Sequence, residues 1–292
     1  MRNIIRNNIE RIYIDMLTRI LTSIVSIFIL LPILYFSNTY VFPIAVAIMT
    51  AIALYEMFSC IGCKSKYPLT VPVYLAGAAI PFIGKIANGI EAVLPLIYAV
   101  IIIYAIYLFF IAILFNNKYT IEEISMCYMT SIYIIFGFSS ILFLRLISDY
   151  VYLLIFIGAW ITDIFAYFTG KFFGKHKLCE SVSPKKTVEG SIGGAFFCAL
   201  AFVAFGLITL NKGSEIWKYA VLAGIGLIIS AVSQIGDLSM SLIKRHYGIK
   251  DFGKIFPGHG GVLDRFDSII AVSSILFIMI SFLKTLGVNI LI

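Results

Sequence analysis

The stretch SLIKRHYGIKDFGKIFPGHGGVLDRFD, residues 241–267, lies between two long apolar runs of a 292-residue chain. It brings together lysines, arginines, aspartates, two histidines and a group of glycines. Ionisable groups beside lipid are energetically costly, and in membrane proteins they mark sites that bind a ligand or an ion. The mixture of carboxylates with cationic side chains indicates a metal ion together with phosphate.

The composition of the whole chain is that of a polytopic membrane protein. Hydrophobic residues make up 61% of the sequence and charged residues 13%, with a mean hydropathy of +1.02. Soluble domains contain about one quarter charged residues. We therefore expect an all-α integral membrane protein without a sizeable soluble part. No small-residue cleavage site follows the first apolar run, which indicates a membrane span rather than a signal peptide.

Apolar runs of about 20 residues, the length that crosses a bilayer, predict nine transmembrane helices in one membrane domain, residues 1–292. Residues 1–150 hold few ionisable groups and are expected to form a scaffold, whereas residues 151–292 carry the site-like chemistry. The predicted spans are residues 20–37, 40–58, 69–88, 92–115, 124–144, 151–170, 191–210, 217–236 and 267–287.

The distribution of charge predicts the orientation of these spans. With the N-terminus in the cytoplasm, 17 of the 22 lysines and arginines fall on the cytoplasmic side, as the positive-inside rule requires. Two polar loops, residues 171–190 and 237–266, then share that side and can build one site. The net charge of +7 fits basic cytoplasmic loops and does not imply a nucleic-acid partner, because no soluble basic face is available.

The five cysteines are scattered and indicate no disulfide framework. Cys60 and Cys63 have the spacing of metal ligands, but no second pair or nearby histidine completes a zinc site. A helix end with small residues is the more ordinary interpretation of this segment.

A first group of candidate residues lies near the end of the predicted sixth span. Asp163, Ala166, Tyr167 and Gly170 share one helical face. Because Asp163 lies within an apolar run, it is expected to face the protein interior or a wet cavity and to form a wall of the substrate site. The alternative is an aspartate that bonds to a neighbouring helix purely for packing.

A second group is the segment SPKKTVEG, residues 183–190. Lys185 and Lys186 offer mobile point charges that suit phosphate. Thr187 is a candidate cap for the following helix. The alternative interpretation is topological, since lysines near a cytoplasmic helix end are common.

The third group is the stretch of residues 241–267 with the segment that leads into it. If the eighth span continues as a helix, Gln234, Asp237, Ser241 and Lys244 form one polar stripe. The following PGHGG segment predicts an anion nest, because its glycines allow left-handed backbone conformations that direct N–H groups inward. These glycines are Gly258, Gly260 and Gly261.

The stretch ends in two aspartates, Asp264 and Asp267, one helical turn apart. Both can direct oxygens at one hard cation such as Mg²⁺. Arg265 can hold phosphate in bidentate fashion. Each residue also has a simpler explanation: aspartates favour a first helical turn, His259 suits a turn, and a basic loop can hold lipid headgroups. All of them together within so short a stretch indicate a site.

This stretch resembles the signature of the CDP-diacylglycerol synthases, also called phosphatidate cytidylyltransferases. SPKKTVEG at 183–190, QIGDL at 234–238 and Asp163 with Ala166 and Tyr167 also resemble that family, and Glu56 is a weaker match. The matching positions of the signature are Ser241, Lys244, Arg245, Lys250, Asp251, Gly253, Pro257 to Gly261, Asp264, Arg265 and Asp267.

The resemblance implies transfer of the CMP part of CTP to phosphatidate, which gives CDP-diacylglycerol and pyrophosphate. It also implies a Mg²⁺ requirement, a multi-pass enzyme of the inner (plasma) membrane with its site on the cytoplasmic side, and a homodimer. Metal binding is then expected from Asp237, Asp264 and Asp267, and orientation of the triphosphate from Ser241 and residues 258–261. His259 is expected to donate a hydrogen bond, and phosphates to be held by Lys185, Lys186, Lys244, Arg245 and Arg265.

Other functions stay open at the level of sequence. A CTP-dependent polyprenol kinase would use similar groups, whereas the pattern of the CDP-alcohol phosphatidyltransferases is not found in the chain. A transporter for an anionic solute would fit the buried Asp163 and the prolines within spans. Against transport, the polar residues gather at one membrane face rather than at the midplane. An inactive scaffold would bind no nucleotide with Mg²⁺.

Overall fold

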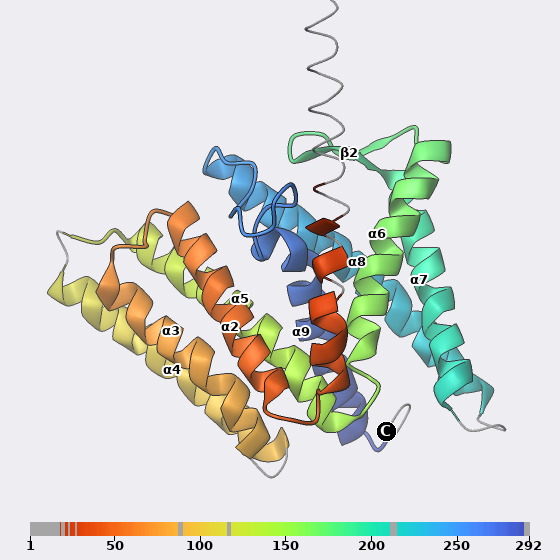
Figure 1. The fold of residues 1–292 in the computed structure, drawn as a ribbon, viewed down its shortest axis with the longest axis horizontal. Helices are drawn as coiled ribbons and strands as arrows, with labels where there is room; N and C mark the ends of the chain where they lie inside the picture. The colour runs from red at the N-terminus through yellow and green to blue at the C-terminus, as the bar shows by residue number, and fades with distance from the viewer. Residues whose placement is uncertain are drawn as a thin grey trace, which may run out of the picture.

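The computed structural model describes residues 18, 21–22, 24–26, 28–86, 90–115, 118–210 and 215–288. This part of the chain is mostly helical, with one short hairpin (Figure 1). The helices are α2 (Val41–Cys60), α3 (Tyr67–Ile86), α4 (Ile90–Leu114), α5 (Ile121–Ile147), α6 (Leu153–Phe173), α7 (Val188–Thr209), α8 (Ile216–His246) and α9 (Leu263–Thr285), and the strands are β1 (Lys177–Cys179) and β2 (Ser183–Thr187).

Within the described residues, seven helices are long and apolar enough to cross a membrane, fewer than the nine spans predicted. The predicted span at 69–88 corresponds to α3, whose apolar part, Tyr67–Ile83, ends before Gly84-Lys85. That part is about 25 Å long, shorter than a hydrocarbon core of about 30 Å. The predicted span at 20–37 lies partly outside the described residues, and Ile24–Tyr35 forms a shorter apolar helix. The coarser prediction of a multi-pass membrane protein is confirmed.

Two helix starts follow directly from local sequence. Thr120 and Glu123 form a capping box at the start of α5, each side chain accepting the other residue's backbone N–H. The predicted cap of the seventh membrane helix is confirmed, because the Thr187 hydroxyl accepts the N–H of Gly190 at 3.2 Å. This cap fixes the point at which β2 ends and α7 begins.

Helix α9 joins two groups of helices, α2 to α5 on one side and α6 to α8 on the other (Figure 1). Its contact with α5 is close. A Cβ atom on Gly137 would lie 2.2 Å from Cγ2 of Ile270, and the Ser273 hydroxyl donates to the Gly137 carbonyl at 2.6 Å. A small residue at the helix interface and a polar bond across it are typical of helix association within membranes.

Glycines also bring α6, α7 and α8 together. A Cβ atom on Gly193 would lie 2.3 Å from the Thr169 hydroxyl of α6. On the other side of α7, Gly226 of α8 lies against the backbone of Ala199, where a Cβ atom would come within 2.8 Å of Cα. The β1–β2 hairpin and the loop after α8 therefore extend from helices that are closely packed against one another.

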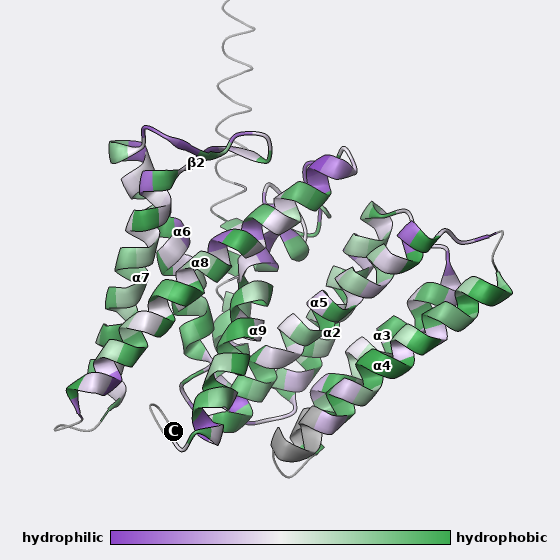
Figure 2. Cartoon of the chain, turned by 180° about the vertical axis from the view of Figure 1, so that it is seen from behind, coloured by the Kyte–Doolittle hydropathy of each residue, from purple (hydrophilic) through white to green (hydrophobic). Residues whose placement is uncertain are grey.

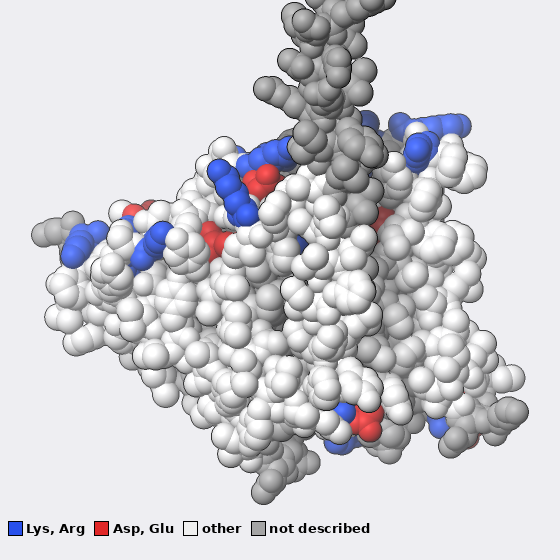
Figure 3. Space-filling view, viewed as in Figure 1, with Lys and Arg blue, Asp and Glu red and all other residues white. Residues whose placement is uncertain are grey.

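Hydrophilic residues gather at one end of the helix bundle, which we call the polar face. It carries the β1–β2 hairpin and residues 247–262, the loop between α8 and α9 (Figure 2). Lysines and arginines are concentrated there, with a smaller group of charges at the opposite end (Figure 3). Between the two ends, the surface in this view is almost without charge, as expected of a region in contact with lipid.

Candidate active site

Three aspartates from different helices meet near the polar face. Asp163 comes from α6, Asp237 from α8 and Asp267 from α9, and their carboxylates lie close enough to repel one another electrostatically. Asp163 is exposed, and Asp237 and Asp267 are half-buried, so that all three are within reach of a dissolved cation. We call these three residues the carboxylate cluster.

Lys186 of β2 lies beside the carboxylate cluster. Its ammonium nitrogen is 2.5 Å from Oδ2 of Asp237, and the Ser241 hydroxyl donates to Oδ1 of Asp237 at 3.4 Å. This ion pair confirms that the two distant polar segments, residues 183–190 and 237–267, meet in space. One lysine beside three carboxylates leaves the cluster with an excess of negative charge.

The hairpin that presents Lys186 is fastened to the start of α7. The Glu189 carboxylate accepts the backbone N–H groups of Lys175 and His176, at 3.0 and 3.3 Å, and pairs with the His176 ring at 2.6 Å. The ammonium of Lys177 donates to the Pro184 carbonyl at 2.6 Å across the hairpin. These bonds restrict the hairpin, in which no residue is buried.

The polar stripe expected on the eighth membrane helix is divided among three roles. Helix α8 continues to His246, so Gln234, Asp237, Ser241 and Lys244 do follow one another along one helix. Gln234 is buried and donates to the Ser191 carbonyl at 3.3 Å, which fastens α8 to α7. The next two residues of the stripe face the carboxylate cluster, and the last one belongs to a separate buried pair.

That buried pair consists of Lys244 and Asp264, with 2.8 Å between the ammonium nitrogen and Oδ1. The second oxygen of Asp264 accepts the backbone N–H groups of Phe252 and Gly261, at 2.8 and 2.9 Å. Both oxygens of Asp264 are therefore engaged by protein groups. Asp264 is predicted to bind metal together with Asp237 and Asp267; in the structure its oxygens bond to Lys244 and the loop backbone, and its role as a metal ligand stays a prediction.

Glu56 holds the same loop from the opposite side. It is buried near the end of α2, and its two oxygens accept the N–H groups of Val262 and Leu263 at 3.0 and 2.9 Å. An anion at these first N–H groups of α9 is favoured by the helix dipole. In the sequence, Glu56 is only a weak match to the family pattern, which predicts no role for it. Its one available signal was a glutamate within an apolar span.

The glycines of the loop serve two geometric needs. Gly258 and Gly260 have φ angles of +75° and +87°, in the left-handed region that favours glycine. Gly253 and Gly261 leave room for Glu56, because a Cβ atom on either would lie 2.2 or 2.3 Å from its Oε1. Of the predicted anion nest, residues 258–261, the N–H of Gly261 donates to Asp264, and the two N–H groups that follow the nest donate to Glu56.

A polar pocket of about 650 Å³ opens beside this loop. Its lining includes His259 and three cationic residues, Lys250, Lys254 and Arg265, against one carboxylate, Asp251, which leaves an excess of positive charge. The Nδ1 atom of His259 lies 2.7 Å from the hydroxyl of Thr22, so Thr22 lies at the edge of this pocket. We call it the basic pocket.

The remaining predicted residues lie at the surface of the polar face. Lys185 is exposed next to Lys186 on β2, and Arg245 is exposed at the end of α8. The Arg245 guanidinium donates to the Ile249 carbonyl at 3.5 Å. Tyr167, predicted on the same face as Asp163, is also exposed.

Comparison with known proteins agrees with this arrangement. The model of the cytidylyltransferase family matches residues 17–283. The chain belongs to the cytidylyltransferase family. A phosphatidate cytidylyltransferase of Staphylococcus aureus (strain COL) is 34% identical over 267 residues, which cover 91% of this chain and 99% of that protein. One of Bacillus subtilis (strain 168) is 32% identical over 280 residues, 92% of this chain and 98% of that protein.

The Mg²⁺ ion expected of this cytidylyltransferase can be tested against the described side chains. Among them, no group of three or more His, Cys, Asp or Glu residues is placed to enclose a metal ion by itself. The carboxylate cluster nevertheless fits a cation that completes its shell with water and phosphate oxygens, as Mg²⁺ usually does. Its residues come from three helices, retain access to solvent and hold more negative charge than Lys186 balances. Which of these aspartates bind metal stays a prediction.

Proposed function

We propose that this chain is a phosphatidate cytidylyltransferase, which converts CTP and phosphatidate into CDP-diacylglycerol and pyrophosphate. The observation that carries the proposal is the ion pair between Lys186 and Asp237, because it joins the two signature segments into one site at the polar face. Family membership over most of the chain, and the names of the relatives, support the same reaction.

In this reaction an oxygen of the phosphatidate phosphate attacks the α-phosphorus of CTP. The bond between the α- and β-phosphates breaks, and its electron pair leaves with pyrophosphate. Phosphatidate is already an anionic nucleophile, so no strong general base is required. The main obstacle is repulsion between two polyanions, which positioned cations relieve.

The cationic residues of the polar face suit this task. Lys186 lies over the carboxylate cluster, where it can hold a phosphate without leaving Asp237. Arg265 follows Asp264 and lines the basic pocket, whose volume and charge fit a triphosphate. Mg²⁺ bound at Asp237 and Asp267, beside Asp163, would neutralise phosphate charge and stabilise the departing pyrophosphate. Lys244 and Asp264 hold the loop in place.

We further propose that the polar face is cytoplasmic and that the membrane is the plasma membrane. The concentration of lysine and arginine at that face supports this orientation. A cysteine in place of the exposed Lys185 should react with a membrane-impermeant maleimide only after spheroplasts are opened. The homodimer implied by the family resemblance is also a proposal, and crosslinking of the purified enzyme in detergent tests it.

Two forms of labelled CTP test the reaction itself. With the purified protein, Mg²⁺ and phosphatidate, label from [α-³²P]CTP should enter the lipid phase, and label from [γ-³²P]CTP should appear in pyrophosphate. A lipid kinase would transfer the γ-label to the lipid, and a transporter would leave both nucleotides intact. Either of these results would refute the proposal. The Asp267→Asn variant is the control for activity of co-purified enzymes.

A further inference from the structure

An apolar groove of about 740 Å³ runs along the helix bundle between α4 and α5 on one side and α8 and α9 on the other. Its lining includes Met129 and Phe136 of α5, Ile235 of α8, and Ile275 and Ile278 of α9. Several of these side chains are exposed, as is usual where a helix surface meets lipid. We call this feature the α5–α9 groove.

The α5–α9 groove begins at the candidate active site. Gly236, which precedes Asp237 of the carboxylate cluster, lines it. Tyr133 of α5 also lines it and lies close enough to Asp267 for the two groups to interact electrostatically. The groove therefore leads from the neighbourhood of the carboxylate cluster into a mainly apolar region. This is the chemistry of a lipid with an anionic headgroup.

The length of the groove matches one leaflet of a bilayer. Eleven positions of α9 separate Asp267 from Ile278, a rise of about 16 Å along the helix. Half of a hydrocarbon core is about 15 Å thick. An acyl chain that starts at the level of the carboxylate cluster would thus end near Ile278.

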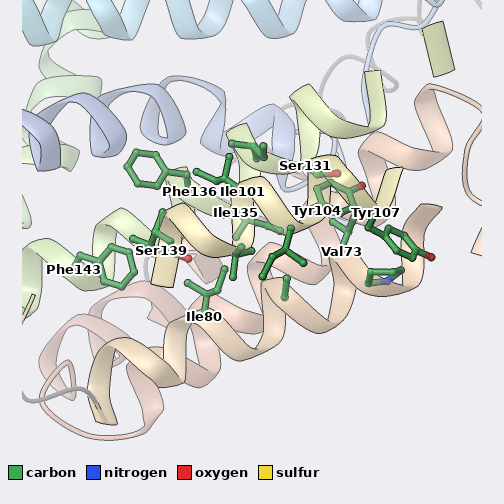
Figure 4. A pocket seen from close by; sticks show the side chains of 16 residues that line it. Val73, Ile80, Ile101, Tyr104, Tyr107, Ser131, Ile135, Phe136, Ser139 and Phe143 are labelled. Atoms are coloured by element: carbon green, nitrogen blue, oxygen red, sulfur yellow. The ribbon is translucent and has the colours of Figure 1, made fainter. Parts of the chain in front are cut away.

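A second apolar cavity, between α3, α4 and α5, lacks this connection. It has a volume of about 310 Å³, and Ile101, Ile132 and Phe136 line both spaces. Figure 4 shows Ile101 and Phe136 on the side of the cavity nearest α9. Its described lining contains neither Gly236 nor Tyr133, the two residues through which the α5–α9 groove adjoins the carboxylate cluster. The α5–α9 groove is therefore the better candidate for the substrate lipid.

We propose that the α5–α9 groove binds one acyl chain of phosphatidate while its phosphate lies at the carboxylate cluster. This inference rests on the proposed function and adds to it the place where the lipid substrate is held. The apolar wall contributes binding in proportion to the length of chain that it covers, at roughly the same gain for each methylene. The affinity of the groove should therefore depend on the length of the acyl chain.

Substitution of Ile278 by tryptophan tests the proposal, because it fills the deep end of the groove. Ile278 is 50% exposed, so the larger side chain can be accommodated without repacking the core. Leu200→Trp on α7 is the matched control, since Leu200 is 48% exposed and does not line the groove. Activity is compared on dioctanoyl and dioleoyl phosphatidate in mixed micelles.

We expect Ile278→Trp to lower kcat/KM for the dioleoyl lipid by about tenfold, a loss equivalent to about two buried methylenes. The shorter dioctanoyl chains should be converted at close to the wild-type rate, and Leu200→Trp should leave the ratio of the two lipids unchanged. If Ile278→Trp left the ratio of kcat/KM for the two lipids unchanged, acyl-chain binding in the groove would be refuted, whereas the proposed reaction would not be affected. No product from either lipid with wild-type enzyme would overturn the reaction itself.

A phosphatidate with a diazirine near the end of one acyl chain supplies a second measurement. Peptides of α5, α8 or α9 that line the groove should carry the label, and long-chain phosphatidate should compete for it. Labelling confined to α3 or α7 would contradict the proposal. So would efficient crosslinking between Ile278→Cys side chains of two copies, because a second protein molecule would then cover the groove.

Discussion

The carboxylate of Glu56 accepts a hydrogen bond of 2.9 Å from the backbone N–H of Leu263, 207 positions further along the chain. Together with the bond to Val262, it fixes the start of α9 to the end of α2. The half of the chain with few ionisable groups thus supplies one of the anchors of the signature loop.

Replacement of Glu56 by glutamine keeps the size of the side chain and turns one acceptor into a donor. That donor would face a backbone N–H, and a buried unsatisfied pair costs about 1–3 kcal/mol. We expect a lower melting temperature and a fall in kcat of about tenfold or more, because loop groups lose their alignment. Glu56→Asp should recover part of the activity. The exposed Glu122→Gln is the control, and equal behaviour of the two glutamine variants would rule out the anchoring role.

Gly261→Ala should disturb the same contact from the other side. The added Cβ atom would lie 2.3 Å from Oε1 of Glu56, too close for either group to remain in place. We expect loss of most activity together with reduced thermal stability. Gly224→Ala on α8 is the matched control, because no atom lies within 4 Å of the added methyl group. If both variants retained wild-type turnover, tight packing around Glu56 would be excluded.

Asp264 and Asp267 should respond differently to conversion into asparagine. Asp264→Asn leaves the buried Lys244 without its counter-ion, which costs about 3–5 kcal/mol. Its main effect should be on stability and kcat, with an unchanged half-saturating Mg²⁺ concentration. Asp267→Asn should instead raise that concentration by at least about tenfold. A titration of activity with Mg²⁺ gives the half-saturating concentration for each variant. If Asp264→Asn raised that concentration and Asp267→Asn did not, Asp264 would be the metal ligand.

Lys186→Ala removes the ammonium beside Asp237. A charge-assisted hydrogen bond to phosphate contributes about 1.5–3 kcal/mol, so KM for a substrate should rise by about tenfold or more. The half-saturating Mg²⁺ concentration should not rise, because the carboxylate cluster then carries less positive charge nearby. Lys175→Ala removes an equal charge from the same face and should have little effect. If the two variants had identical kinetics, Lys186 would contribute only to the orientation of the protein in the membrane.

Local patterns were sufficient to predict the helices that carry the site. The Thr187 cap, the extension of α8 beyond Asp237 and the meeting of residues 183–190 with residues 237–267 all follow from helical period and loop charge. The count of nine spans is not confirmed, because α3 has an apolar part of intermediate length and the first predicted span lies partly outside the described residues. Hydropathy alone distinguishes such a helix poorly from a full span.

The partners of individual carboxylates could not be predicted in the same way. Asp264 and Asp267 are one turn apart, and sequence alone favours a shared role for them. In the tertiary structure their partners differ: Asp264 pairs with Lys244 and the loop backbone, whereas Asp267 lies near Asp237 and Asp163. Asp163 and Glu56 lie on helices far away in the sequence, and nothing in their local pattern specifies which residues they meet. These contacts arise from how α2, α6 and α8 surround α9.

The position of α9 between the two helix groups limits how the protein can be dissected. A recombinant fragment of residues 151–292 would contain the entire signature yet lack the α5 surface and the Glu56 carboxylate. The signature is therefore not a transferable module. Grafting it onto another helical scaffold would require the scaffold to reproduce contacts from a region that shares no recognisable motif with it.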